Sequence, residues 1–282
     1  MIFVLGATGK VGRRLVPALL DAAAGVRALT RDPAKARIDP RAEVVRGDLD
    51  TSDLPALLAG ADRVFVLSQG HSADREVAVA QAAAQAGVTH LVKLSTTGVH
   101  FGQKDAISRA HAEAEQAIRE AGPAWTILRP GTFMDNRFAW IGSIREENAV
   151  YVPETDPPSA LVHVRDIAAV AALALTTSGH EGATYELTGG EALTTEQQVA
   201  ILAEAIGRPL KYVEETESAA KERLIRMYGW PAKAIDGLFA LKRESAPHER
   251  VVFDTVERLL GRRPLTFAAW AEENASAYHH QE

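Results

Sequence analysis

The sequence of 282 residues contains no cysteine. This absence excludes disulfide bonds, thiolate zinc sites and catalytic thiols, and it is compatible with a reducing compartment. No apolar run approaches the roughly 18 residues that are needed to cross a bilayer, and the apolar residues 1–5 are too few for the core of a signal peptide. We therefore expect a cytoplasmic protein without membrane contact.

The sequence also has no excess of positive charge. It contains 31 Lys and Arg residues and 37 Asp and Glu residues, so its formal net charge is −6. No segment gathers a dense run of basic residues, so direct binding of DNA or RNA is not expected. The nine histidines form no His-Glu-x-x-His or similarly spaced set of metal ligands. The length fits a nucleotide-binding domain with a smaller appended lobe.

Near its start, the sequence contains three glycines at a spacing of three. Gly6, Gly9 and Gly12 follow the apolar residues 2–5 and precede a helical pattern over residues 13–24. This order of strand, tight turn and helix aims backbone N–H groups and a helix dipole at one point, and glycine lets a pyrophosphate approach closely. The motif predicts a bound dinucleotide. The expected contacts are Gly6, Thr8, Gly9, Lys10, Val11 and Gly12.

Beyond this motif, apolar strands alternate with helical segments. The patterns predict further strands at residues 26–30, 44–45, 64–67, 90–95 and 125–128, and helices at 54–58, 76–86, 108–120, 168–176 and 196–206. Such alternation predicts an α/β fold with a Rossmann-like, doubly wound parallel sheet. We expect an NAD(P)-binding domain over residues 1–150, completed by part of 160–190, and a smaller, interleaved α/β substrate-binding lobe over residues 151–282.

The residue after the second predicted strand indicates which dinucleotide is bound. NAD-preferring sites usually place a carboxylate there, whereas this chain has Arg31, with Lys35 one turn later. A guanidinium can bind the extra phosphate of NADP(H) in a fork and stack on adenine, so we expect NADP(H) to be preferred over NAD(H). We expect neither flavin nor metal. The alternative is that Arg31 is a solvated loop cation paired with Asp32.

The Tyr-x-x-x-Lys dyad of short-chain dehydrogenases, in which lysine lowers the pKa of the tyrosine, is absent. None of the five tyrosines has a lysine four residues later, and the helix expected to carry the dyad has His111 and Glu115 instead. Ketone reduction creates an alkoxide that needs a positioned acid. Hydride addition to a quinone instead gives a phenolate-like anion, whose conjugate acid has a pKa of about 10. A cationic dye accepts hydride without any proton.

These features together resemble the NmrA-like family of atypical short-chain dehydrogenases, and within it the branch of bacterial NADPH:quinone oxidoreductases and triphenylmethane dye reductases. The segments that carry the resemblance are residues 6–12, 30–33, 125–131, 162–167 and 263–267, with Ser95, His111 and Glu115. They span the chain nearly from end to end. The resemblance implies an NAD(P)H-dependent oxidoreductase, although the family also contains regulators that sense the dinucleotide without turnover.

We therefore expect an NADPH-dependent reductase that transfers hydride to a quinone or similar aromatic small-molecule acceptor. The alternative is a non-catalytic NADP(H)-sensing protein that acts through a protein partner. An epimerase of nucleotide sugars is disfavoured, because it would need the missing dyad. The sequence leaves the oligomeric state open.

Strand ends supply the remaining expected cofactor contacts, both by the strand-end rule and by the resemblance. Asp48 suits the adenine amino group, although an Asp in a Gly-Asp turn is nearly as often a simple turn residue. Ser95 is expected at the nicotinamide ribose or the substrate, with a satisfied strand-terminal hydroxyl as the alternative. The full set is Asp48, Leu49, Leu67, Ser68, Gln69, Ser95, Pro130, Gly131, Thr132 and Phe133.

Candidates for proton handling are His111, Ser95 and Lys104. A surface pair of His111 with Glu115 is the alternative for the histidine. Lys104 is included because isoflavone-reductase-like relatives use a lysine. Aromatic residues are expected to line a flat acceptor pocket, with core packing as their alternative. They are Phe133, Phe138, Trp140, Tyr228 and Trp230.

Overall fold

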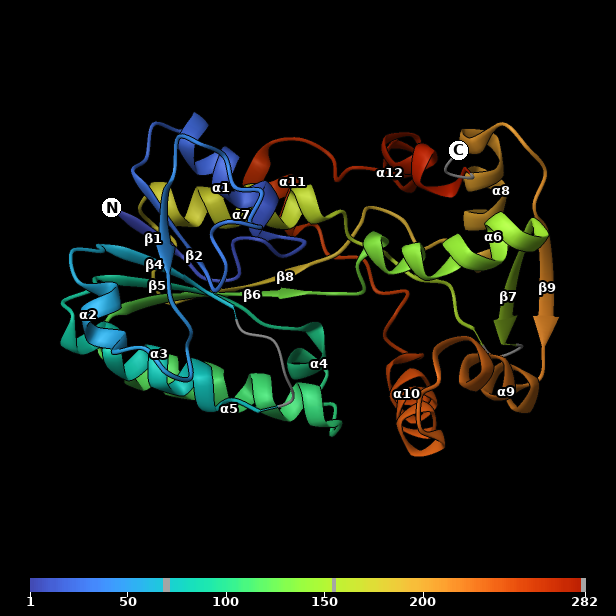
Figure 1. The fold of residues 1–282 in the computed structure, drawn as a ribbon, viewed down its shortest axis with the longest axis horizontal. Helices are drawn as coiled ribbons and strands as arrows, with labels where there is room; N and C mark the ends of the chain where they lie inside the picture. The colour runs from blue at the N-terminus through green and yellow to red at the C-terminus, as the bar shows by residue number, and fades with distance from the viewer. Residues whose placement is uncertain (68–71, 154–155, 280–282) are drawn as a thin grey trace. The chain divides into compact units, whose positions relative to one another are not determined.

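The computed structural model describes residues 1–67, 72–153 and 156–279 (Figure 1). The chain forms two compact units. Unit 1 comprises Met1–Gly131, Val164–Leu187 and Thr255–Arg262, and unit 2 comprises Thr132–His163, Thr188–Asp254 and Arg263–Glu282. The first stretch of unit 1 thus ends at Gly131 rather than near residue 150, because the helices that follow pack into a separate apolar core.

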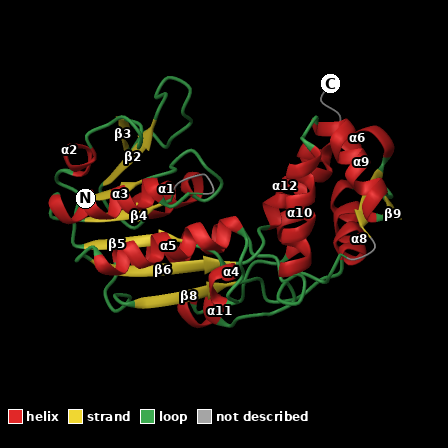
Figure 2. Cartoon of the chain, turned by 90° about the horizontal axis from the view of Figure 1, so that it is seen from below, coloured by secondary structure: helices red, strands yellow, loops and turns green. Residues whose placement is uncertain are grey.

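Unit 1 is built on a seven-stranded sheet in which every pair of neighbours is parallel (Figure 2). The order is β3-β2-β1-β4-β5-β6-β8. The order reverses at β1, so the carboxyl ends of β1 and β4 border a crevice of the type in which nucleotides bind. The expected Rossmann-like α/β fold is confirmed. The strands are β1 (Ile2–Val4), β2 (Val26–Thr30), β3 (Glu43–Arg46), β4 (Arg63–Val66), β5 (His90–Leu94), β6 (Ala124–Pro130) and β8 (Ala183–Leu187).

Helices cover both faces of this sheet (Figure 1). On one face α1 packs against α7, and on the other lie α2, α3 and α5. The first helix ends earlier than residue 24, because Ala23 takes a left-handed conformation with φ of 58°. The helices are α1 (Gly12–Asp21), α2 (Leu54–Leu58), α3 (Asp74–Gln85), α4 (Thr97–His100), α5 (Ala106–Glu120), α7 (Val164–Thr176) and α11 (Thr255–Leu260).

The core of unit 1 explains why its strands read as continuous apolar runs. Parallel strands covered on both faces bury all their side chains, as residues 2–5 and 64–66 do here. Side chains from α3 and α5, such as Val79 and Ile118, fill the space against the sheet. Strand β5 is buried along its whole length although it contains a lysine, Lys93, which is fully buried.

Unit 2 packs helices around a pair of parallel strands, β7 (Ala149–Pro153) and β9 (Lys211–Glu215). Its core is aromatic, with Trp270 and Tyr278 among the largest fully buried side chains. Helix α8 begins at a capping box formed by Thr194 and Gln197. The remaining elements are η1 (Met134–Trp140), α6 (Ile141–Glu147), α8 (Thr195–Ile206), α9 (Glu217–Tyr228), α10 (Ala232–Ser245), α12 (Phe267–Asn274) and η2 (Ala275–Tyr278).

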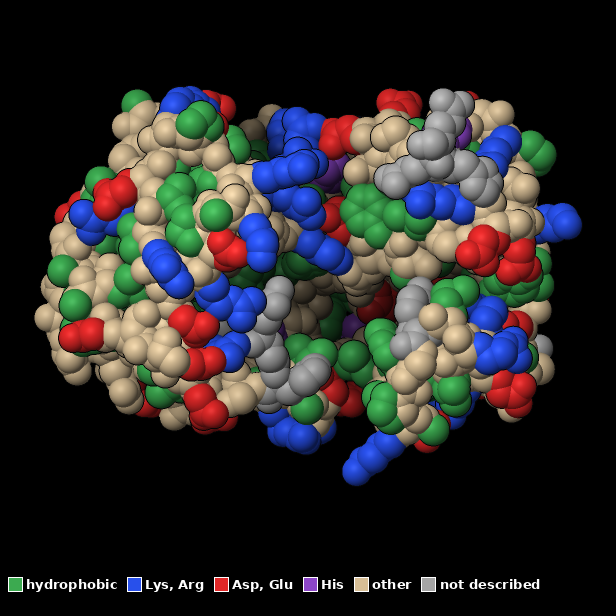
Figure 3. All heavy atoms as spheres, in the orientation of Figure 1, with side chains coloured by type: hydrophobic (Ala, Val, Ile, Leu, Met, Phe, Trp, Pro, Cys, Tyr) green, Lys and Arg blue, Asp and Glu red, His purple; other side chains and the backbone are tan. Residues whose placement is uncertain are grey.

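The surface of the described residues carries charges of both signs. Acidic and basic side chains both occur on the face that Figure 3 shows. Across the part of the chain that the structure describes, no helix combines the length and apolarity that a membrane span requires.

Candidate active site

The glycine loop between β1 and α1 is folded so tightly that it requires glycine. Gly6 has a φ of +64°, and the Gly9 N–H donates to the Gly6 carbonyl oxygen over 2.9 Å. A Cβ placed on Gly12 would lie 2.1 Å from that same oxygen. Leu67, directly after β4, lies against Gly6, 3.2 Å from where a Cβ would be. The structure thus brings the predicted residues Gly6, Gly12 and Leu67 together.

The N-terminus of α1 behind this loop carries no compensating side chain. Val11 occupies the N-cap position, where its side chain makes no capping hydrogen bond, and the first turn contains no acidic residue. Four N–H groups at the start of a helix lack partners within it, and together with the helix dipole they favour an anion. The loop and helix start therefore fit a pyrophosphate. Thr8 and Lys10 are exposed beside this position, whereas Val11 is buried.

Arg31 follows the last residue of β2 and is exposed. Its neighbour Asp32, the alternative partner considered for Arg31, forms an exposed ion pair with Lys35, whose Nζ lies 3.2 Å from Asp32 Oδ2. The preference of this site for NADP(H) stays a prediction.

Asp48 follows β3 with a carboxylate that stabilises its own turn. Its Oδ1 accepts a hydrogen bond from the Asp50 N–H over 3.0 Å, and the Asp48 N–H donates to Ser52 Oγ over 2.9 Å. Leu49 is partly buried against the core of unit 1. Asp48 thus has the contacts of a simple turn residue, which is the alternative to a contact with adenine. The adenine contact stays a prediction.

The predicted residues at the ends of β4 and β6 fall into three groups. Ser68 and Gln69 lie outside the described residues. In unit 1, Pro130 is buried at the end of β6, and the Gly131 N–H donates to the Leu187 carbonyl over 2.9 Å. In unit 2, the Thr132 hydroxyl donates to Glu249 over 3.0 Å, and Phe133 forms a bridge to Val162. These contacts fix the backbone around the predicted nicotinamide position.

Ser95 and Glu115 form a buried ionic cluster with Arg129. The Glu115 side chain is fully buried and accepts a fork of hydrogen bonds from the Arg129 guanidinium at 2.9 and 2.6 Å. Ser95 donates to the same carboxylate over 2.6 Å, and Arg119 adds a fourth hydrogen bond over 2.9 Å. Burial acts to raise the pKa of Glu115, but these hydrogen bonds outweigh it and the pKa is lowered. Glu115 therefore stays ionised and fully bonded.

His111 lies one turn before Glu115 on α5 and pairs with a different residue. Its Nδ1 is 2.9 Å from Lys93 Nζ. Lys93 also donates to the Leu94 carbonyl over 2.6 Å and forms an ion pair of 2.8 Å with the buried Glu76 of α3. Burial, with the Lys93 ammonium as the next cause, lowers the pKa of His111 to about 3. The imidazole is neutral at pH 7.

The expected alternative for His111, a surface pair with Glu115, is thus wrong. Each of the two side chains is bonded inward, to Lys93 and to Arg129 respectively. Lys104 is exposed just before Asp105, which caps α5 by accepting from the N–H groups of residues 107 and 108. Lys93 was missed by sequence reasoning. The available signal was a lysine inside an otherwise apolar strand.

Phe138, predicted to line an acceptor pocket, packs in the core of unit 2. Its ring centroid is 5.3 Å from that of Trp270 and 6.5 Å from that of Tyr278. Both partners are fully buried. This is the core packing that was the alternative for these aromatics, and pocket contact by Phe138 stays a prediction.

The other predicted aromatics lie in different surroundings. The Arg137 guanidinium stacks over the Trp140 ring, 4.9 Å from its centroid. Trp230 is 47% exposed, in the link between α9 and α10. Tyr228 ends α9, and its side chain lies outside those described. Trp140 and Trp230 are not among the described residues that line the small pocket of unit 2.

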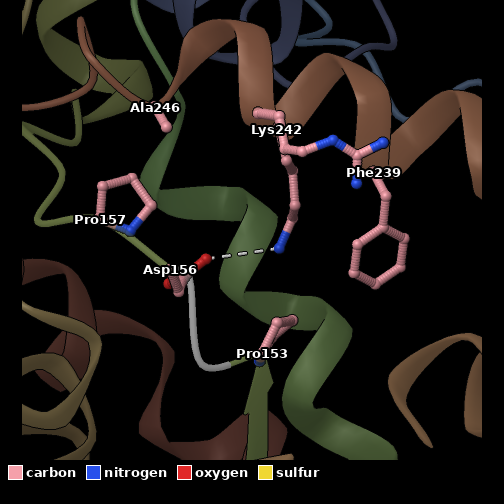
Figure 4. A pocket seen from close by; sticks show the side chains of 7 residues that line it. Pro153, Asp156, Pro157, Phe239, Lys242 and Ala246 are labelled. Carbon is pink, nitrogen blue, oxygen red and sulfur yellow. Dashed lines mark hydrogen bonds and ion pairs between the residues drawn. The ribbon is translucent and has the colours of Figure 1, made fainter. Parts of the chain in front are cut away.

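That pocket lies in unit 2 and has a volume of about 120 Å³ (Figure 4). Lys242 Nζ lies 3.4 Å from Asp156 Oδ1 across it, and Asp156 also accepts from the Thr195 hydroxyl over 2.5 Å. Lys242 and Asp156 therefore pair with each other, and Arg243 pairs with Glu217 over 2.7 Å. The lining residues are Pro153, Asp156, Pro157, Phe239, Lys242, Arg243 and Ala246.

The site geometry agrees with comparisons to known proteins. A family model described as NAD(P)H-binding matches residues 6–178, which begin at the first glycine of the loop. The chain belongs to this NAD(P)H-binding family. The resemblance to NmrA-like reductases noted in the sequence is confirmed.

Two curated relatives cover nearly the whole chain. One is a (4-alkanoyl-5-oxo-2,5-dihydrofuran-3-yl)methyl phosphate reductase of Streptomyces griseus, 41% identical over 281 residues and 99% of each chain. The other is an NAD(P)H azoreductase of Xenophilus azovorans, 38% identical over 288 residues and 99% of each chain.

A solved structure shows the same architecture with its cofactor. It is an NADPH-dependent quinone oxidoreductase of Escherichia coli in complex with NADPH, with a TM-score of 0.84 and 26% identity, covering 97% of this chain and 99% of that one. Together with the family match, these proteins support NAD(P)H binding and a role as an NAD(P)H-dependent reductase for this chain.

Proposed function

We propose that this protein is an NADPH-dependent reductase that transfers hydride to a quinone or a similar conjugated electrophile. The observation that carries the proposal is the glycine loop before a helix start without a capping side chain or an acidic residue, because such a loop at the reversal point of the sheet suits a pyrophosphate. NADPH supplies the hydride when bound. Gly6, Gly9 and Gly12 hold the pyrophosphate, and Arg31 binds the 2′-phosphate.

The class of acceptor is supported by what the relatives reduce. Their names specify an alkanoyl furanone, an azo compound and a quinone. Each of these accepts hydride at a bond that is conjugated to an electron-withdrawing group, and each becomes an anion when it does. A reductase of such acceptors needs orientation and anion stabilisation more than a strong acid, so the Tyr-x-x-x-Lys dyad is dispensable. The substrate-binding role of unit 2 is part of this proposal.

A turnover assay tests this function. Purified protein is mixed with NADPH, or in parallel NADH, and the absorbance of the reduced cofactor is followed without oxygen while 1,4-naphthoquinone, an azo dye or malachite green is added. We expect NADPH to be consumed far beyond the protein concentration. If NADPH binds but no acceptor is reduced, the reductase proposal is overturned and the sensor acting through a protein partner replaces it.

Substitution Arg31→Ala is expected to weaken the use of NADPH specifically. A charged hydrogen bond contributes about 1.5–3 kcal/mol, so the KM for NADPH should rise by roughly 10- to 100-fold while the KM for NADH changes little. Lys233→Ala is the matched control, because Lys233 is an exposed cation on α10 of unit 2. Equal effects of Arg31→Ala on the two cofactors would contradict the assignment of Arg31 to the phosphate.

A further inference from the structure

The Lys93 ammonium can donate three hydrogen bonds, and the structure places three acceptors around it. They are the Leu94 carbonyl at 2.6 Å, Glu76 Oε2 at 2.8 Å and His111 Nδ1 at 2.9 Å. The acceptors come from β5, α3 and α5, so the ammonium joins the sheet to the two helices on one of its faces. A fully buried lysine is costly unless it is paired, and Glu76 provides the pairing charge.

This arrangement determines the tautomer of His111. Because Nδ1 faces an ammonium that can only donate, Nδ1 must accept, and the ring proton of the neutral imidazole resides on Nε2. His111 is partly exposed. Its neutral imidazole therefore carries an N–H donor at Nε2 and has the Lys93 ammonium beside Nδ1.

The strand-end position of this pair suits a reacting anion. Lys93 and Ser95 point to the same face of the sheet, because side chains alternate along a strand, and both bond to α5. Ser95 lies at the carboxyl end of β5, the edge at which ligands bind in sheets of this type. His111 lies in the half of α5 that begins at that edge.

We propose that Lys93 and His111 form a proton relay that stabilises and then protonates the anion left by hydride transfer. The proposal rests on the reductase function above. In the relay, the Nε2–H bond breaks as the anionic oxygen or nitrogen of the reduced acceptor takes that proton. A new Nδ1–H bond forms with a proton from the Lys93 ammonium. The acceptor leaves neutral, the imidazole keeps one proton, and Lys93 becomes an amine. Because Lys93 is fully buried, it regains its proton through His111: Nε2 takes a proton from solvent and Nδ1 returns its proton to the amine.

The groups facing this pair are consistent with a relay. Lys93 faces Glu76 from α3 and His111 and Glu115 from α5, and His111 faces Lys93 as well as Glu115 and Asp105. Glu76 is the only one of these carboxylates that forms an ion pair with the lysine in the described structure. It stabilises the ammonium before transfer, while burial favours the neutral amine afterwards. Lys93 is thus a positioning residue and proton source that acts through His111.

The experiment compares acceptors that differ in their need for a proton. 1,4-Naphthoquinone becomes an anion on accepting hydride, whereas the cation malachite green becomes neutral. The test variant is Lys93→Met/Glu76→Gln, which removes both buried charges and keeps similar volumes. We expect turnover of the quinone to fall about 100-fold, as for the loss of one anion-stabilising donor, and turnover of the dye to change less than about 3-fold. Lys211→Met, an exposed lysine of β9, is the control.

A second variant and a rescue measurement distinguish loss of the relay from a folding defect. His111→Gln leaves the buried ion pair intact and should show the same selective loss with the quinone. In both variants, added imidazole buffer should restore quinone turnover in proportion to its acid form, because a small acid replaces the relay. NADPH titration of each variant, followed by cofactor fluorescence, shows whether the cofactor site is intact.

The outcomes separate the relay from the reductase function. Unchanged quinone turnover in the variants overturns the relay, and so does an equal loss with both acceptors that imidazole does not rescue. Wild-type protein that reduces neither of these acceptors nor the azo dye overturns the reductase function, and the relay with it. If the wild type reduces only the quinone, rescue by imidazole supports the relay and its absence overturns it.

Discussion

Gly12→Ala is expected to remove measurable NADPH binding. The new Cβ would lie 2.1 Å from the Gly6 carbonyl oxygen and 2.7 Å from the Ala7 Cα, both of them backbone atoms that cannot rotate away. The loop would have to open, which displaces the N–H groups at the start of α1 from their common direction. We expect the Kd for NADPH, measured by fluorescence titration, to rise by more than about 100-fold, since several charge-assisted hydrogen bonds are lost together.

Gly237→Ala is the matched control for this substitution. Gly237 lies inside α10, has no positive φ, and a Cβ there meets no atom within 4 Å. Alanine also has the higher helix propensity, so this variant should be as stable as the parent or slightly more so. Full NADPH binding by a folded Gly12→Ala protein would show that the loop is not the pyrophosphate site.

Glu115→Gln is expected to destabilise the fold by about 3 kcal/mol, the lower end of what breaking a buried ion pair costs. The amide cannot accept all four hydrogen bonds that reach Glu115, and it leaves the largely buried Arg129 without its main counter-charge. Urea denaturation measures the loss. Glu43→Gln serves as the control, because the Glu43–Arg27 pair is much more exposed and should contribute less than about 1 kcal/mol.

Glu115 should also make the stability of the folded protein depend on pH. The pKa of Glu115 is lower in the folded protein than its ordinary value of 4.5, so the folded state binds the proton less tightly than the unfolded state. Its contribution to stability is therefore complete above that ordinary value and disappears as the pH falls through the lowered one. Urea midpoints measured between about pH 6 and pH 3 should fall less steeply for Glu115→Gln than for the wild type. Parallel curves would contradict the assignment.

The parallel sheet could be predicted from the sequence because its signals are local. Strand β1 is an uninterrupted apolar run and β4 is apolar after Arg63, and the loop after β1 contains glycines where the backbone requires them. The bounds of α1 were less predictable, since alanines at residues 22–24 favour a helix and the left-handed Ala23 ends it. The pairing of β7 with β9 was missed, because more than fifty residues separate partners that carry no shared pattern.

The candidate site was predictable only where a motif defines it. His111 and Glu115 stand out by their position on α5, but their actual partners, Lys93 and Arg129, lie 18 and 14 residues away on β5 and β6, and no local pattern links them. A lysine in an apolar strand is read from sequence as an edge or surface residue, because burial of a charge depends on a partner that only the fold supplies. Phe138 shows the converse case, since apolar aromatics suit a pocket and a core equally well.

The chain passes between the two units five times, and this has a consequence for synthesis. A ribosome releases the chain from its N-terminus, so unit 1 still lacks β8 when the first stretch of unit 2 has already emerged. The ion pair between Arg262 and Asp166, separated by 96 residues, closes later still. Nascent chains that end before residue 187 therefore expose an unpaired edge of β6. We expect such chains to aggregate or to recruit chaperones, and neither unit to be obtainable as one continuous fragment.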